Sequence, residues 1–240
     1  MFSTEIEKFL RLKKYPVFDP KAVFFDMDGV LFDSMKFHVS AWVQAMVESG
    51  LPFTELEGYM NEGRTGASTI DGVFMRVYGR EATEEEKQEI YKLKSTYFEA
   101  EAKIEQIPFV HELLLKIQTQ NLGIFLVTGS GQATLLDSLE KHFPGLFIQE
   151  RMVTAFDVKM GKPHPEPYLM ALKKSKLNPW EVVVIENAPL GVESANAAGL
   201  FTIGVNTGPL DLKILTDSGA NIVFDGMKDL FENWNKILNS

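Results

Sequence analysis

Two aspartates close an apolar run near the start of the chain, in the stretch KAVFFDMDGVLFDS (residues 21–34). Asp26 and Asp28 are two residues apart, and in extended backbone such residues point to the same side. Gly29 then allows the backbone to turn sharply away. Two carboxylates this close repel each other unless a proton or a cation lies between them. The pair therefore predicts acid–base or metal chemistry rather than a strand that only fills a core.

Three further segments, FLVTGSG, GKPHPEPY and VVVIENAPLG, carry polar groups after an apolar run or a glycine: Thr128, Gly129, Ser130, Lys162, Glu186 and Asn187. The threonine hydroxyl and the two backbone N–H groups after it can face an anion where a helix begins. The lysine adds a positive charge, and the glutamate and asparagine offer oxygen atoms that suit a hard cation. Together with the aspartate pair, these groups are typical of Mg²⁺-assisted phosphoryl transfer.

The elements that must position these groups are short, nearly continuous apolar runs, which predict strands at 22–25, 123–128, 182–185, 201–205 and 222–224. Such runs are typical of a parallel sheet that is covered on both faces. Helix-like patterns lie between them, and this alternation predicts a doubly wound α/β fold. The carboxyl ends of the strands, where ligands bind in such folds, then carry the polar groups described above.

A helical insertion interrupts this alternation. Residues 35–105 show only helical patterns, with Ser34 as an expected N-cap, Gly50 as a stop signal, and a capping box formed by Thr83 and Glu86. We therefore expect a helical cap domain at 35–105 and a core domain at 21–34 and 106–240. Residues 1–20 are expected to form an N-terminal extension with a short amphipathic helix that is ended by Pro16.

Composition narrows the class of protein. The 240 residues carry a formal net charge of −9 and no cysteine. The acidic balance disfavours nucleic-acid binding, which needs a basic face. The absence of cysteine excludes disulfides, thiolate metal sites and a cysteine nucleophile. No long apolar run predicts a signal peptide or a membrane span, so we expect a cytoplasmic enzyme, a monomer, that acts on a small phosphate-bearing substrate.

The motifs carry a resemblance. DMDGV with Thr128, Lys162-Pro and Glu186-Asn187 resembles the four motifs of the haloacid dehalogenase superfamily, and DMDGVLFDS with GKPHPEPYLMAL is similar to its β-phosphoglucomutase-like branch. The resemblance covers the chain from about residue 21 and implies that Asp26 forms an aspartyl phosphate while Asp28 acts as acid and base. It implies phosphoryl binding by Thr128 and the N–H groups that follow it, and charge neutralisation by Lys162.

The same resemblance implies an Mg²⁺ site. Asp26, the backbone carbonyl of Asp28, Glu186 and Asn187 would hold the ion directly or through water. Asn187 departs from the branch, which usually has Glu-Asp at this step, so one charge is missing. Glu62 in the expected cap could restore that charge if the cap brings it to the metal.

Three other departures concern the substrate. Where the mutases of this branch have a lysine and an arginine in the cap, this sequence has Glu62 and Gly66, and their basic residue after the second motif is Gly131 here. In the mutases these basic residues would bind a second phosphate, and Arg64 could supply part of that positive charge here. In contrast, His38 lies where the mutases also have a histidine, and it favours a mutase.

The loop EGRTGAS with IENAPLG resembles a subgroup that contains inorganic pyrophosphatases, so we favour pyrophosphate as substrate. A β-phosphoglucomutase or a hexose-phosphate phosphatase is the alternative. A non-catalytic binding module of the same superfamily is a more remote one, because such a module usually lacks Asp26, Asp28 or Lys162, and all three are present.

Overall fold

A parallel sheet forms the centre of the structure, a computed structural model that describes residues 2–131 and 133–240. Its strands are β1 (Ala22–Phe25), β2 (Gly123–Val127), β3 (Met152–Val153), β4 (Val182–Glu186), β5 (Phe201–Val205) and β6 (Ile222–Phe224). They are hydrogen-bonded in the order β3-β2-β1-β4-β5-β6, and all pairs are parallel. The predicted doubly wound α/β fold is confirmed, and the two-residue strand β3 is an addition that the sequence did not predict.

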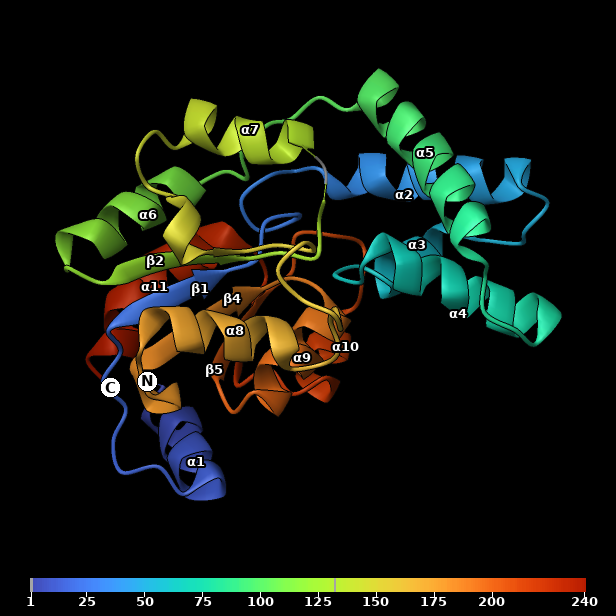
Figure 1. The fold of residues 1–240 in the computed structure, drawn as a ribbon. Helices are drawn as coiled ribbons and strands as arrows, with labels where there is room; N and C mark the ends of the chain where they lie inside the picture. Colours follow the sequence, from blue (N-terminus) through green and yellow to red (C-terminus); the bar gives the residue numbers. More distant parts are fainter. Residues whose placement is uncertain (1, 132) are drawn as a thin grey trace.

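Helices cover both faces of this sheet (Figure 1). They are α6 (Val110–Thr119), α7 (Ala133–His142), α8 (Glu166–Ser175), α9 (Pro189–Ala197), α10 (Leu212–Asp217) and α11 (Met227–Leu238). Every residue of β1 is buried, because alternate side chains enter two different cores. Val23 and Phe25 belong to the core with α6, α7 and α11, whereas Ala22 and Phe24 belong to the core with α8 and α9. Burial on both faces explains the continuous apolar runs.

The insertion forms a helical cap of α2 (Met35–Glu48), α3 (Glu55–Met60), α4 (Gly66–Tyr78) and α5 (Glu84–Glu101). Figure 1 shows these helices gathered at one end of the molecule, while both chain termini lie at the other end. The capping box of Thr83 and Glu86 is present. Ser34 occupies the N-cap position of α2, but its hydroxyl makes no capping bond and donates to Asp28 instead. The cap has a hydrophobic core of its own, and the residue directly before its first helix, Ser34, contacts the site.

The N-terminal extension forms helix α1 (Ser3–Lys13), which ends in a left-handed residue, Lys14, two positions before Pro16. Its buried residues Ile6 and Phe9 join the core on the α6 side of the sheet. None of the helices among the described residues is long and apolar enough to cross a membrane.

Candidate active site

Lys162 is the central cation of the site. Its Nζ lies 2.6 Å from Asp26 Oδ1 and 2.6 Å from Glu186 Oε1, and it donates to the carbonyl oxygen of Val127 at 3.0 Å. The ammonium group is fully buried, and the carboxylates of Asp26 and Glu186 are almost as inaccessible. These partners follow or end β1, β2 and β4, so the central strands of the sheet deliver them to one point.

Glu186 is fully engaged by the protein. Its Oε1 also accepts a hydrogen bond from the Tyr168 hydroxyl at 2.7 Å, and its Oε2 accepts from the backbone N–H groups of Asn187 and Ala188. We expected this carboxylate to complete a metal shell. The geometry instead directs it at Lys162, so its clearest task is to hold that lysine in place.

Burial and the nearby carboxylates of Glu186 and Asp28 raise the pKa of Asp26 to about 8, although Lys162 acts in the opposite direction. Burial alone would lower the pKa of Lys162, but the attraction of Asp26 and Glu186 is stronger, and the net direction is upward. The lysine therefore stays protonated. One buried ammonium faces several carboxylates, so this edge of the sheet favours a further positive charge.

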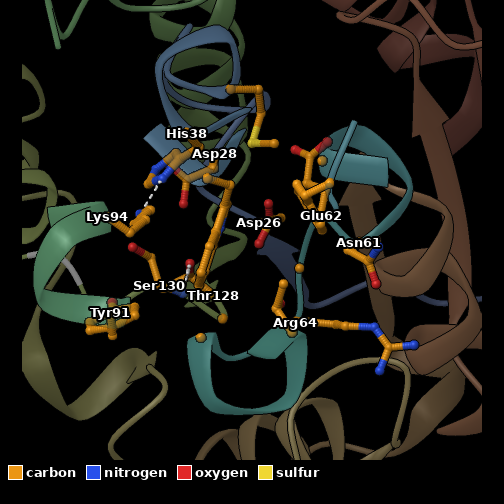
Figure 2. A pocket seen from close by; sticks show the side chains of 18 residues that line it. Asp26, Asp28, His38, Asn61, Glu62, Arg64, Tyr91, Lys94, Thr128 and Ser130 are labelled. Carbon is orange, nitrogen blue, oxygen red and sulfur yellow. Dashed lines mark hydrogen bonds and ion pairs between the residues drawn. The ribbon is translucent and has the colours of Figure 1, made fainter. Parts of the chain in front are cut away.

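A chain of hydrogen bonds holds Asp28. Its Oδ1 accepts from the Ser34 hydroxyl at 2.6 Å and lies 3.0 Å from His38 Nε2. Lys94 of α5 lies on the other side of the imidazole, with its Nζ 2.8 Å from His38 Nδ1 (Figure 2). A protonated lysine can only donate, so Nδ1 must accept and Nε2–H must donate to Asp28. The cap thereby fixes the tautomer of the histidine and the orientation of Asp28.

Burial shifts the pKa values of the residues in this series of hydrogen bonds. Burial would raise the pKa of Asp28, but His38 and the hydrogen bonds to its carboxylate lower it overall. The pKa of His38 is lowered by burial and by Lys94. Burial also lowers the pKa of Lys94 to about 8, against the attraction of Asp28. The ammonium of this lysine faces three aromatic rings, those of Trp42, Tyr91 and Phe98. Near neutral pH, this arrangement favours an ionised Asp28 beside a neutral histidine.

The cap loop after α3 brings Glu62 into the site. Glu62 is only 7% exposed, and its Oε1 accepts a hydrogen bond from Asn187 Nδ2 at 2.6 Å. Burial raises the pKa of Glu62 well above its usual range, the hydrogen bond from Asn187 opposes this, and the charges of Asp26 and Glu186 add to it. The other amide atom, Asn187 Oδ1, is buried and has no hydrogen-bond partner. The expected approach of Glu62 to this region is thus present.

The backbone of the cap loop that carries Glu62 packs directly on the backbone of the core domain. A β-carbon at Gly129 would lie 2.2 Å from the carbonyl oxygen of Gly63, so only glycine fits beneath the cap loop. The N–H of Ser130, which we expected to face an anion, donates to Thr128 Oγ1 at 3.0 Å in this structure. The guanidinium of Arg64 turns away from Asp26 (Figure 2), so Arg64 does not take the expected place of a second cationic grip.

A small cavity remains between core and cap. Its volume is about 60 Å³, which is room for only a few water molecules. Its wall includes Asp26 and Asp28 from the core and Glu62, Tyr91 and Lys94 from the cap. Figure 2 shows Asp26 at the centre of these side chains. The cavity can therefore present one phosphoryl group to Asp26 while the cap limits what is attached to it.

Residues 23–205 of the chain match the family of haloacid dehalogenase-like hydrolases. The chain belongs to this family. It is 31% identical over 209 residues to a phosphorylated carbohydrates phosphatase of Thermotoga maritima, covering 83% of this chain and 92% of that protein. It is 27% identical over 218 residues to the beta-phosphoglucomutase of Bacillus subtilis, covering 88% of this chain and 91% of the mutase.

A solved structure from Bacteroides vulgatus, provisionally named a beta-phosphoglucomutase, is 51% identical to this haloacid dehalogenase-like hydrolase. The two superpose with a TM-score of 0.96 over 99% of this chain and 97% of the other. The relatives include phosphatases and a phosphomutase, so phosphoryl chemistry is the property that they share.

The donor set of this haloacid dehalogenase-like hydrolase fits a magnesium ion. In the part of the chain that the structure describes, no group of three or more Asp, Glu, His or Cys side chains is arranged so that it could hold a metal ion by itself. The set implied by the motifs is mixed, however: it comprises the Asp26 carboxylate, the Asp28 backbone carbonyl, the Asn187 amide and Glu186. The Glu186 carboxylate is bonded to Lys162 and Tyr168 in this structure. The unpartnered Asn187 Oδ1 is what such a site leaves open, since a buried acceptor normally has a partner.

Two residues of the site escaped the sequence analysis. Lys94 carries no motif, yet it lies at the spacing of the buried residues Ile90 and Phe98, and this spacing could have revealed it. Tyr168 supports Glu186 from α8, in a stretch that was read only as part of a motif. Both act through contacts between elements that are distant in the sequence.

Proposed function

We propose that this haloacid dehalogenase-like hydrolase is an Mg²⁺-dependent phosphohydrolase that prefers a small phosphate compound, inorganic pyrophosphate above others. The observation that carries this proposal is the position of Glu62. The cap loop places a carboxylate, in place of the lysine of the mutase branch, within 2.6 Å of Asn187. A carboxylate there disfavours a second phosphate held by the cap and favours a metal-bound substrate with a compact leaving group.

The proposed reaction has two displacements. The Asp26 carboxylate attacks phosphorus, the bond to the leaving oxygen breaks, and Asp28, in the small fraction of molecules in which it is protonated, gives that oxygen its proton. A water molecule then attacks the aspartyl phosphate and passes a proton to Asp28, which releases phosphate and restores Asp26. The Ser34 and His38 hydrogen bonds, which lower the pKa of Asp28, support its role as base in the second step.

Lys162 and Thr128 would contact the transferring oxygens. The magnesium ion would be held by the Asp26 carboxylate, the Asp28 carbonyl and the Asn187 amide, with Glu62 supplying the charge that Asn187 lacks. When bound, it would neutralise charge on the phosphoryl oxygens. Its presence would also relieve the crowding of carboxylates that raises the pKa values of Asp26 and Glu62.

The small cavity supports a compact substrate. A β-carbon at Gly66 would lie 2.3 Å from the Tyr91 ring, so the ring occupies the space that the arginine of the mutase branch would need. A cavity of about 60 Å³ also leaves little room for a hexose while the cap is shut. Both features favour pyrophosphate over a sugar phosphate.

A β-phosphoglucomutase or a hexose-phosphate phosphatase is the second candidate. It is favoured by the names of the relatives and by the His38–Asp28 contact, which places a histidine where the mutases have one. A non-catalytic module is disfavoured, because Asp26 and Lys162 form a buried ion pair whose desolvation is costly without a task.

The test compares rates on pyrophosphate, a small organic phosphate ester, hexose phosphates and β-glucose 1-phosphate in Mg²⁺, for the wild type, Glu62→Ala and the control Glu55→Ala. Glu55 is an exposed carboxylate on α3 of the same cap. We expect pyrophosphate to be the best substrate and Glu62→Ala to lose at least about tenfold on it, with a smaller loss on small organic esters. Isomerisation of β-glucose 1-phosphate faster than pyrophosphate hydrolysis would establish the second candidate instead.

A further inference from the structure

Thr207, in the loop after β5, reaches the catalytic loop from the opposite half of the chain. Its hydroxyl donates a hydrogen bond of 2.5 Å to the backbone carbonyl oxygen of Gly29, which is 178 residues away in sequence. Gly29 directly follows Asp28. Nothing in the motifs pointed to Thr207, which lies outside all four.

The peptide that Thr207 holds lies against the proposed metal site. Gly29 has a φ of +78°, and its N–H donates to the carbonyl oxygen of Phe32 at 2.8 Å. A β-carbon on Gly29 would lie 2.0 Å from Asn187 Nδ2 and 3.0 Å from Glu62 Oε1. The backbone here is therefore packed directly onto the Asn187–Glu62 pair. Within the loop, this peptide is held by a hydrogen bond of 3.3 Å from the Val30 N–H to the Met27 carbonyl, and Thr207 adds a shorter one from outside the loop.

The loop that carries Thr207 is itself well held. The N–H of Asn206 donates to the Phe224 carbonyl at 2.9 Å, and its side-chain Nδ2 donates to the Leu210 carbonyl at 3.0 Å. On the cap side, a β-carbon at Gly208 would lie 3.9 Å from the ring of Tyr59 on α3. The loop thus lies between the sheet and the closed cap, and it offers Thr207 a firm support.

We propose that Thr207 is a positioning residue for phosphoryl transfer. Its hydroxyl fixes the Gly29 peptide, and through it the Asp28 backbone and the surface on which Asn187 and Glu62 meet. This inference rests on the proposed function, since it concerns the same site. A hydroxyl that served only to tie down the loop would affect stability and leave metal use and turnover unchanged.

The test uses Thr207→Val, which keeps the shape and removes the donor, and Thr207→Ser, which keeps the donor. Thr207→Ala is a second donor-free variant in case valine impairs folding. Thr119→Val is the control, because Thr119 also donates to a backbone carbonyl, at an exposed end of α6. The readouts are kcat, the Mg²⁺ concentration for half-maximal rate, and the rise in melting temperature caused by Mg²⁺ with beryllium fluoride, a mimic of the aspartyl phosphate.

Loss of the donor should lower kcat about fivefold to tenfold and raise the Mg²⁺ requirement, the size of effect that one hydrogen bond supports. It should also reduce the melting shift, while the serine variant stays within about twofold of the wild type. Equal behaviour of the valine and serine variants, or a valine variant that matches the wild type, would overturn the inference.

The two proposals fail separately. A wild type that releases no phosphate but is stabilised by Mg²⁺ with beryllium fluoride would refute the proposed function, and the melting shifts would still decide the role of Thr207. A wild type that shows neither property would refute both.

Discussion

Replacing the buried lysine of the cap, Lys94→Met, should change how stability depends on pH. Burial lowers the pKa of Lys94 from 10.5 to about 8. The unfolded chain therefore binds more protons than the folded protein between about pH 8 and 10.5, and the wild type gains stability as pH rises through this window. At 1.36 kcal/mol for each pH unit, the gain approaches about 3 kcal/mol. Methionine has no proton to lose, so the variant should lack this gain.

The assay is urea unfolding of the wild type and Lys94→Met at pH 7.5 and pH 10. The free energy of unfolding of the wild type, relative to the variant, should increase by about 2 to 3 kcal/mol between these values. Lys92→Met is the control, because Lys92 is exposed on the same helix, and it should behave as the wild type does. Parallel pH curves for the wild type and Lys94→Met would show that the reasoning about Lys94 is wrong.

Three further predictions concern the site. Asp26→Asn should abolish phosphate release with an unchanged circular dichroism spectrum, because an amide cannot attack phosphorus as a carboxylate does; residual activity near normal would remove Asp26 as nucleophile. A chelator should stop turnover and added Mg²⁺ should restore it, whereas Zn²⁺ should restore little, since the donors are oxygens; full activity in metal-free buffer would contradict the proposed site. Gly129→Ala should lower kcat at least about tenfold, because its β-carbon would meet the Gly63 carbonyl at 2.2 Å and keep the cap ajar; normal kinetics would mean that catalysis does not need this closed form.

The sequence predicted the sheet well where strands are long and buried on both faces. The run at 182–185 matches β4, and that at 201–205 matches β5. The strand β3 was missed because two residues, Met152 and Val153, carry no periodicity. Ser34 was placed correctly at the start of α2, but its hydroxyl donates to Asp28, a preference that only the tertiary structure reveals.

The candidate site was predictable as far as it follows strand ends. Asp26 and Asn187 lie together because they directly follow the parallel strands β1 and β4, and Lys162 joins them from the loop between β3 and α8. Lys94 and Thr207 could not be found in this way. Lys94 reaches the site through the packing of α5 on α2, and Thr207 acts through a backbone carbonyl, which has no signature in the sequence.

The loop that bears Glu62 makes the cap responsive to the contents of the site. In the closed form this carboxylate is buried beside Asp26, Asp28 and Glu186, and burial and each of these charges disfavour its ionised form. Shutting a site without a cation is therefore opposed by repulsion, and a cation among the same groups turns that repulsion into attraction. The stability of the closed cap thus depends on the net charge within the site. A cation in the site would therefore stabilise the closed form, in which Glu62 is only 7% exposed to bulk water.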